Sequence, residues 1–407
     1  MPTRSKNCGP LTISDFEADL QTFCEFGELT RTKLVRQAGV EFPVFENEFW
    51  TSGQRSGHRI HEISYRACYK PQLPAFFINR FCETGATVYD PFMGRGTTLI
   101  EAQLGGCRAI GNDSNPLCRR LIAPRLKPPR QDAVERAIEE VVLPEAPEID
   151  ETLLAFYHPD TLREIAGWKQ VFAEARDEGD PVLAWLEMIA LNRLTGHSSG
   201  FFSVYTLPPN QAVTADRQLK INEQRNQIPP YRDTRALMLK KSKYLLGRDL
   251  PEDYGRDESL LLAQSADRTP EIADDSVDLV VTSPPFLDTV DYAQDNWLRL
   301  WFSNIEIDRE NLWQIRSAAD WAAKMSGVFK ELRRVLKDDG LIAFEVGEVR
   351  KGSVKLEESV IEAAVQAGLI PQLVVINTQE FTKTANCWGV ANNKKGTNSN
   401  RIVLLGK

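Results

Sequence analysis

The amino-acid sequence predicts an α/β protein built on one mostly parallel sheet of about seven strands, with a long helical insertion. Two observations lead to this prediction. In the first and last parts of the chain, short apolar runs alternate with amphipathic runs of helix length, as in strand–helix–strand units. Between them, residues 120–250 keep a mostly helical period. We therefore expect an N-terminal segment with the first half of the sheet domain (1–119), the insertion (120–250) and the second half (251–407).

The first half of the sheet domain is predicted from a strand, turn, helix and strand in succession. Helix-like patterning marks residues 14–37, and YKPQLPAFFINRF (69–81) is typical of a helix that begins at a proline. ATVYDPF (86–92) predicts a short buried strand, and GRGTTLIEAQLGG (94–106) a turn and a helix that ends at glycine. RAIGND (108–113) predicts a second strand, which completes a βαβ unit and implies parallel pairing.

The second half continues the alternation of strands and helices. Strands are expected at SLLLAQSAD (259–267), VDLVVTSPP (277–285), GLIAFEVGEV (340–349), LIPQLVVINTQEF (369–381) and NRIVLLGK (400–407). Helices are expected at WAAKMSGVFKELRRVLKDDG (321–340) and SVIEAAVQAGL (359–369).

Run lengths and cysteine spacing indicate where the protein works. No apolar run approaches the roughly 18 residues of a membrane span, and the N-terminus MPTRSKNCGP has no apolar segment of a secretory signal. The seven cysteines form no CxxC pair, so we expect no zinc site. An odd cysteine count without spacing is typical of a reducing compartment. These features predict a cytoplasmic protein without a membrane partner.

The charge is unevenly distributed along the chain. The net charge of −8 disfavours a nucleic-acid partner, but its distribution matters more than its sum. From Asp132 to Asp180, fourteen Asp and Glu face four Lys and Arg, whereas Arg193 to Arg248 holds ten Lys and Arg and three acids. The two blocks are either solvated helical faces or a basic surface for nucleic acid with an acidic block that faces away from it.

The loop DPFMGRGTT follows the first predicted strand, at the edge where a parallel sheet places its ligand. Gly94 and Gly96 permit a tight turn and a close approach of ligand to backbone, and the next helix offers free N–H groups to an anion. A phosphate-binding P-loop requires a lysine that this loop lacks, and a dinucleotide fingerprint requires glycine in place of Leu99. What remains is a glycine loop paired with Asp113, 23 residues after Asp90, whose carboxylate suits ribose hydroxyls.

This arrangement resembles that of S-adenosylmethionine-dependent methyltransferases, and three motifs are similar to those of the DNA amino-methyltransferases, which methylate adenine N6 or cytosine N4. Their motif Asp-Pro-Phe-x-Gly-x-Gly-Thr-Thr is matched from Asp90 to Thr98, and their Lys-Pro segment by Lys70 and Pro71. Their (Asn/Asp/Ser)-Pro-Pro-aromatic motif is matched by residues 283–286. The matches cover the sheet-forming half of the chain. The resemblance implies a Rossmann-like methyltransferase fold, S-adenosyl-L-methionine as cofactor and DNA, double-stranded by expectation, as partner.

The resemblance also implies which residues hold the cofactor. Asp113 would bind the ribose. Asp267, at the end of the third predicted strand, would accept from the adenine amine, and its alternative role is to cap a helix or turn. The expected cofactor-binding residues are Lys70, Pro71, Asp90, Pro91, Phe92, Gly94, Gly96, Thr97, Thr98, Asp113, Ser114 and Asp267.

The corner Ser283-Pro284-Pro285-Phe286 has the residue types that amine methylation requires. An exocyclic amine is conjugated with its ring, so its lone pair is a poor nucleophile. The Ser283 side chain and the Pro284 carbonyl can accept its two N–H bonds, and the prolines fix the carbonyl direction. Phe286 can stack on a base rotated out of the duplex. Methylation at cytosine C5 would need a Pro-Cys nucleophile, and the sequence holds no such dipeptide.

The choice between the two base amines stays open at this point. In the family that the chain resembles, Ser-Pro-Pro goes mainly with cytosine N4 and Asp-Pro-Pro mainly with adenine N6. Serine and aspartate can accept from either amine. We therefore expect cytosine N4, with adenine N6 as the alternative.

The insertion has the composition of a target-recognition region. It contains the basic block, and GHSSGFFSVYTLPPNQ and ADRQLKINEQRNQIPPYR combine hydroxyls, aromatic rings, amides and cations. Arg and Lys suit phosphates and guanine, and Asn and Gln suit adenine edges. Taken singly, each of these residues is also consistent with an ordinary surface or packed polar group. The expected DNA-binding residues are Arg55, Arg59, His197, Ser198, Arg217, Lys220, Asn222, Arg225, Lys240, Lys241 and Lys243.

Two other functions are consistent with these motifs. Some RNA methyltransferases that act on base amines also carry Pro-Pro-aromatic motifs, and a catalytically silent nucleic-acid-binding subunit could use the same fold. In one class of the family, defined by the order of its motifs along the chain, a target-recognition region separates the cofactor motifs from the catalytic motif. Here the insertion lies before the third strand, earlier than in that class, so the class of the enzyme stays open. The resemblance to bacterial modification enzymes further implies companion restriction or defence components.

Overall fold

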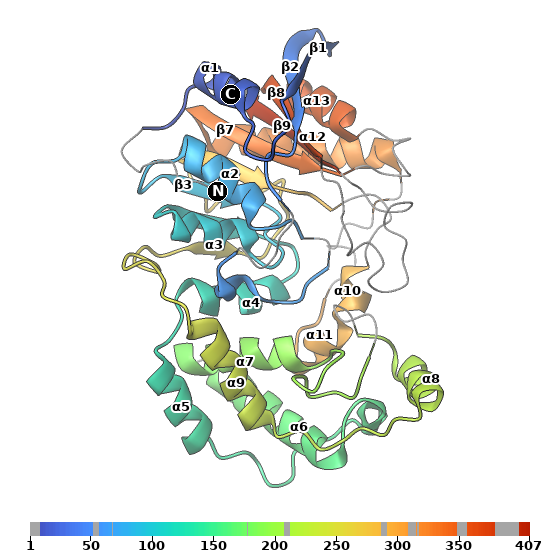
Figure 1. Cartoon of the computed structure of the whole chain (residues 1–407). Helices are drawn as coiled ribbons and strands as arrows, with labels where there is room; N and C mark the ends of the chain where they lie inside the picture. Colours follow the sequence, from blue (N-terminus) through green and yellow to red (C-terminus); the bar gives the residue numbers. More distant parts are fainter. Residues whose placement is uncertain are drawn as a thin grey trace.

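Nine strands form a single sheet in the part of the chain that the computed structural model describes (Figure 1). The structure describes residues 9–51, 57–66, 68–176, 178–206, 212–285, 291–307, 315, 317–347, 356–378 and 399–407. The strands are β1 Arg31–Gln37, β2 Val40–Asn47, β3 Thr87–Asp90, β4 Arg108–Asn112, β5 Leu260–Leu262, β6 Val277–Thr282, β7 Leu336–Val346, β8 Ile370–Thr378 and β9 Ser399–Gly406.

The sheet is mixed, in the order β1-β2-β8-β9-β7-β6-β3-β4-β5. Strands β5, β4, β3, β6 and β7 pair in parallel. Strand β9 lies antiparallel between β7 and β8, and β2 adds to β8 in parallel. The parallel centre brings the carboxyl ends of β3, β4 and β6 to one edge, where a ligand site is expected.

Each of the seven strands predicted from the sequence is present, but the strand count and the expected helix over 14–37 are corrected. Helix α1 ends at Thr22, and Arg31–Gln37 forms a hairpin with β2 through a turn at Ala38 and Gly39, both at positive φ. Strand β1 is a largely exposed edge strand, so its sequence lacks the apolar alternation of a half-buried strand. The sheet therefore has nine strands rather than seven.

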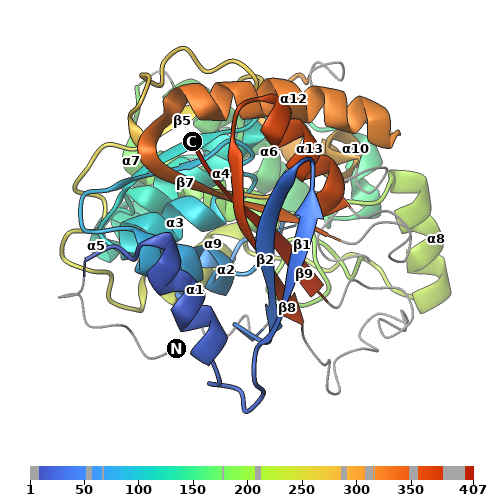
Figure 2. The same cartoon turned by 90° about the horizontal axis from the view of Figure 1, so that it is seen from above.

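Helices cover both faces of the sheet (Figure 2). One face packs on α12 Ala318–Val335 and α13 Leu356–Gln366, and the other on α1 Ile13–Thr22, α2 Gln72–Phe81 and α3 Thr97–Leu104. Successive side chains of β6 point to opposite faces of the sheet. Val280 packs in the core beneath α12 and α13, whereas Leu279 and Val281 pack in the core beneath α1, α2 and α3. The core helices thus fix the ends of the central strands.

The helical period of residues 120–250 is present as a block of helices on one side of the sheet domain (Figure 1). Its elements are α4 Leu117–Leu126, α5 Gln131–Glu140, η3 Glu151–Ala155, α6 Pro159–Ala175, α7 Pro181–Arg193, α8 Ala215–Arg225 and α9 Thr234–Leu246. Four of these helices start at an aspartate or threonine whose side chain accepts a backbone N–H, namely η3, α7, α8 and α9. No described helix is long and apolar enough to cross a membrane.

A short segment after the corner at Ser283 returns to this helical block. It consists of the short helices α10 Tyr292–Asp295 and α11 Trp297–Ser303, with α11 packed on α6 and α4. The Trp297 indole donates to the backbone of Ala212 and Val213, each at 3.3 Å. Arg299 donates to the carbonyl of Leu191 at 3.3 Å and to that of Ser64 at 2.7 Å. The end of β6 is therefore connected to the insertion within about twenty residues.

Candidate active site

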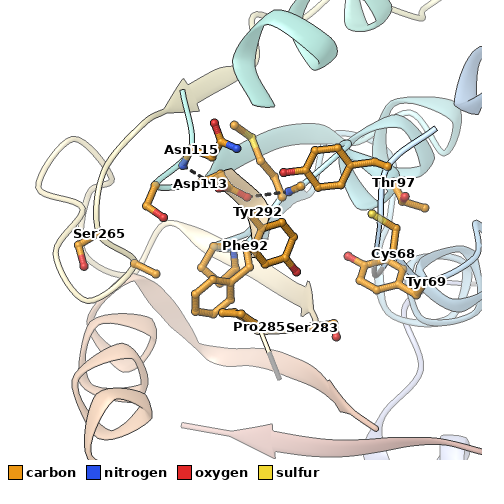
Figure 3. A pocket seen from close by; sticks show the side chains of 16 residues that line it. Cys68, Tyr69, Phe92, Thr97, Asp113, Asn115, Ser265, Ser283, Pro285 and Tyr292 are labelled. Atoms are coloured by element: carbon orange, nitrogen blue, oxygen red, sulfur yellow. Dashed lines mark hydrogen bonds between the residues drawn. The ribbon is translucent and has the colours of Figure 1, made fainter. Parts of the chain in front are cut away.

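A pocket lies at the carboxyl ends of β3, β4 and β6 (Figure 3). It holds about 800 Å³ of empty space, open solvent at its mouth included. Its lining is Tyr65, Cys68, Tyr69, Pro91, Phe92, Met93, Gly94, Thr97, Asp113, Ser114, Asn115, Ser265, Ala266, Ser283, Pro285 and Tyr292. The glycine loop and the Ser-Pro-Pro corner, almost 190 residues apart, thus open on the same space.

The Asp113 carboxylate is held by backbone donors at the floor of the pocket. The Gly94 N–H donates to its Oδ2 at 3.0 Å and the Asn115 N–H to its Oδ1 at 2.9 Å. Burial raises the pKa of Asp113, and these two backbone donors oppose that rise. The glycine loop and Asp113, which the sequence analysis paired, are therefore in direct contact, and the loop orients the carboxylate.

The two glycines of the loop have different roles. Gly94 has φ +47° and lines the pocket beside Cys68 and Tyr65. Gly96 has φ +77° and a Cβ there would lie 2.7 Å from Cγ1 of Ile122 in α4. Gly96 is thus required by helix packing as well as by backbone conformation, whereas Gly94 is at the ligand side.

Asp90 points into the protein instead of lining the pocket. Its buried carboxylate accepts from the Tyr69 hydroxyl at 2.8 Å, the Thr282 hydroxyl at 2.6 Å and the Phe92 N–H at 3.1 Å. Burial raises the pKa of Asp90 to about 6, against these hydrogen bonds. Nearby, Thr98 donates to the Val281 carbonyl at 3.1 Å. Asp90 therefore joins the glycine loop to the end of β6.

The expected cofactor-binding residues divide into two groups. Those that line the pocket are Pro91, Phe92, Gly94, Thr97, Asp113 and Ser114. Those outside its lining are Lys70, Pro71, Asp90, Gly96, Thr98 and Asp267. Burial, assisted by Arg95, lowers the pKa of Lys70 to about 8. Asp267 lies beside Gly327 of α12, and its neighbours Ser265 and Ala266 reach the pocket in its place.

Tyr65, Tyr292 and Asn115 are among the pocket residues that the sequence-based prediction omits. The rings of Tyr65 and Tyr292 stack with centroids 6.1 Å apart and an angle of 22°. Asn115 caps α4 by accepting the Leu117 N–H at 3.0 Å, while its buried Nδ2 has no hydrogen-bond partner among the described residues. Asn115 lies two residues after Asp113, so the acidic residue indicates its position in the sequence. No motif in the sequence indicates the two tyrosines.

The corner at Ser283 is tied to the sheet behind it. Ser283 and Pro285 line the pocket, and Pro284 is buried. The Pro285 carbonyl accepts from the Trp321 indole at 3.0 Å. The Ser283 hydroxyl donates to the buried carboxylate of Glu345, a residue that the sequence-based prediction omits. Phe286 lies outside the described residues.

Several expected DNA-binding residues serve the internal structure of the insertion. Lys241 is 7% exposed and pairs with Glu62 at 2.5 Å, so it is removed from the set of exposed cations. Lys243 is exposed and pairs with Glu135 at 3.1 Å. The amide of Asn222 donates to the Ala155 carbonyl at 2.7 Å.

The other expected DNA-binding residues are at the surface. On α8, Arg217, Lys220 and Arg225 are exposed, and Arg225 lies over the Tyr205 ring. The remaining exposed residues are Arg59, which lies over the Tyr244 ring, His197, Ser198 and Lys240. Arg55 lies outside the described residues. No group of three His, Cys, Asp or Glu in the described part of the chain could hold a metal ion.

The pocket fits S-adenosylmethionine on three observations. The oriented Asp113 carboxylate suits the two ribose hydroxyls. The unpaired Nδ2 of Asn115 supplies a buried donor for a ring nitrogen. The aromatic rings of Tyr65 and Tyr292 line the same space and attract a cation such as a sulfonium.

Comparison with known proteins agrees with these features. A protein-family model described as DNA methylase matches residues 31–123 and 277–405, more than half of the chain, and omits most of the insertion. Type II methyltransferase M.BsoBI from Geobacillus stearothermophilus is 22% identical over 310 residues, 68% of this chain and 59% of that protein. Type II methyltransferases M.MjaII from Methanocaldococcus jannaschii and M.MvaI from Kocuria varians are 41% and 33% identical over 59 and 94 residues.

The alignments cover only part of each protein. The chain spans between 11% and 59% of the length of these three relatives, and the M.MjaII and M.MvaI matches cover 14% and 22% of this chain. Among solved structures, the rRNA methyltransferase aviRa from Streptomyces viridochromogenes is 12% identical with a TM-score of 0.33, over 88% of this chain and 94% of that one. A TM-score of this size supports no conclusion. The family match shows that the chain belongs to the DNA methylase family, and its cofactor is S-adenosylmethionine.

Proposed function

We propose that this protein is a site-specific DNA methyltransferase that acts on the exocyclic amine of a base, most favourably cytosine N4. One observation carries the proposal: the Asp113 carboxylate, suited to the cofactor ribose, and the Ser283 hydroxyl, suited to the target amine, open on the same pocket. Family membership and relatives named as type II methyltransferases support it.

The residues of the chain would act mainly by positioning. The cofactor, when bound, supplies an electrophilic methyl group on a sulfonium. The Ser283 hydroxyl oxygen and the Pro284 carbonyl accept the two N–H bonds of the amine, which draws its nitrogen toward tetrahedral geometry. Pro285 is held through its carbonyl by Trp321, so the corner is preorganised before the base arrives. Phe286 would stack on the flipped base.

The insertion would read the target. Its exposed cations on α8 are suited to phosphates, and the loop with His197 and Ser198 presents groups that can contact base edges. The segment with α10 and α11 runs from the corner to this block, which would couple target binding to the pocket. We propose a role in bacterial DNA modification, with companion restriction components.

Methylation by the purified chain tests this function. Unmethylated duplex DNA and, in a parallel reaction, RNA are incubated with isotope-labelled cofactor, and the nucleosides are identified by mass spectrometry. We expect N4-methylcytosine at one recognition site. N6-methyladenine would contradict the choice of base, and labelling of RNA alone, or of nothing, would contradict the function.

A variant pair locates the chemistry at the corner. Ser283→Ala combined with Pro284→Gly should abolish transfer while cofactor binding, measured by calorimetry, stays nearly unchanged. The matched control is Ser276→Ala, at the other end of β6, where the hydroxyl donates only to the Ala273 carbonyl. Full activity in the double variant would exclude the corner from catalysis.

A further inference from the structure

Three neighbouring strands meet at one buried carboxylate behind Ser283. The Ser283 hydroxyl, after β6, donates to Oε2 of Glu345 in β7. Asn400 in β9 donates from Nδ2 to Oε1 of the same carboxylate at 3.0 Å. Strands β6, β7 and β9 are adjacent in the sheet, so this contact is part of the architecture of the domain.

The surroundings of Glu345 make a carboxylate at this position costly. The residue is 4% exposed, and its hydrogen-bond partners within the described part of the chain are neutral, a hydroxyl and an amide. The nearest arginine along β9, Arg401, pairs instead with Glu357 at 2.7 Å. Burial accordingly raises the pKa of Glu345, and the two hydrogen bonds oppose that rise. A buried carboxylate whose partners in the described part of the chain are all neutral contributes little to stability, and buried ionisable groups of this kind occur often at functional sites.

We propose that Glu345 is a positioning residue for the methyl-transfer reaction, which holds the hydroxyl proton of Ser283 and accepts it when the base amine loses a proton. The proposal rests on the proposed function and deepens it. A serine hydroxyl can rotate to donate or to accept. With its proton directed to Glu345, the Ser283 oxygen presents only lone pairs to the pocket and therefore faces an amine as an acceptor.

The proton balance gives the carboxylate a second task. The amine nitrogen forms the new N–C bond with its lone pair, and the electron pair of the broken C–S bond remains on sulfur. The nitrogen then carries one proton in excess. That proton passes to the Ser283 oxygen as the hydroxyl proton passes to Oε2 of Glu345, which becomes a neutral acid and later loses the proton to solvent. Serine is unchanged at the end of the step.

The pair also bears on base choice. Ser283 and Glu345 together carry one negative charge and present an acceptor, as a single aspartate at position 283 would. Both cytosine N4 and adenine N6 offer N–H donors to such an acceptor. The serine alone therefore does not select cytosine, and a charge moved from position 345 to position 283 should still support transfer.

Three chains compared over a range of pH test this inference: wild type, Glu345→Gln, and Glu345→Gln with Ser283→Asp. We expect Glu345→Gln to lower kcat about 10²-fold with little change in KM for cofactor. Wild-type kcat should fall as pH drops through the raised pKa of Glu345, because the neutral acid takes no proton, and the glutamine variant should lack this fall. In the double variant, Ser283→Asp returns the negative charge, and kcat should be about tenfold higher than in Glu345→Gln alone.

A second buried carboxylate provides the matched control. Glu357→Gln also removes a carboxylate that faces β9, but one that contacts Arg401 rather than Ser283. It should lower stability and leave kcat and its pH profile unchanged. An active wild type whose rate and pH profile are matched by Glu345→Gln would overturn the role of Glu345 alone. A wild type that methylates no base amine would overturn the proposed function, and the role of Glu345 with it.

Discussion

Thr282 donates a 2.6 Å hydrogen bond to the buried carboxylate of Asp90, and this contact joins the end of β6 to the end of β3. The two strands are neighbours in the sheet, and each is followed at once by a loop that lines the pocket. Asp90 also accepts from Tyr69, which lines the same pocket. The relative position of the glycine loop and the Ser283 corner therefore depends on one carboxyl group.

Asp90→Asn should change how stability depends on pH. Burial raises the pKa of Asp90 to about 6, so the folded state binds its proton more tightly than the unfolded state. The protonated Asp90 side chain therefore stabilises the folded state. This stabilisation is complete below the pKa of the unfolded state, near 4, and is lost as pH rises through 6. The free energy of unfolding of wild type relative to Asp90→Asn should fall by roughly 2 to 3 kcal/mol over that range. Denaturant titrations at several pH values measure it, and a constant difference would contradict the raised pKa.

Gly96→Ala should destabilise the protein more than a glycine substitution at a similar φ elsewhere. A Cβ at Gly96 meets Ile122, whereas one at Gly39, with φ +81°, meets nothing within 4 Å. We expect a cost of about 1 kcal/mol for Gly39→Ala and about 2 kcal/mol more for Gly96→Ala. Thermal unfolding measures both. If the cost at Gly96 is steric, adding Ile122→Ala should recover part of it, and equal costs at both glycines would exclude the contact.

Local pattern was sufficient to predict the parallel centre of the sheet and the place of the pocket, but not the direction of individual side chains. Asp90 lies within the predicted strand 86–92 and ends the observed strand β3, and its side chain points to Thr282 because the strand end is buried. In the segment KKSK (240–243), Lys240, Lys241 and Lys243 were all expected to be surface cations. Met238, Lys241, Ser242 and Leu245 are all buried, a helical i, i+3, i+4, i+7 pattern that the charges obscured.

Long-range pairing was beyond the reach of local pattern. The stacking of Tyr65 on Tyr292 and the contact of Ser283 with Glu345 join residues that no motif connects. Strand β1 was interpreted as part of a helix because an exposed edge strand carries no apolar alternation. In each case the missing information is which distant surface the segment packs against.

Asn115→Ser should weaken cofactor binding without loss of stability. Serine keeps an oxygen to accept the Leu117 N–H and cap α4, but it removes the buried Nδ2 donor. We expect about tenfold weaker binding of the cofactor, the effect of one buried hydrogen bond, measured by calorimetry. Asn115→Ala should lose both the cap and the donor, so its unfolding temperature should also fall. Wild-type affinity in Asn115→Ser would mean that Nδ2 does not contact the cofactor.

Exposed cations on α8 should contribute to DNA affinity through phosphates. Figure 1 shows this helix at the outer end of the insertion, on the side of α10 and α11, and Arg217 and Lys220 are exposed there. Because each phosphate contact releases condensed counterions, Arg217→Ala with Lys220→Ala should lower the slope of log affinity against log salt by about 2. Arg163→Ala is the control, since that exposed arginine lies on α6 and pairs with Asp160. Binding titrations at several salt concentrations measure the slope, and an equal slope in wild type and the α8 variant would place DNA elsewhere on the protein.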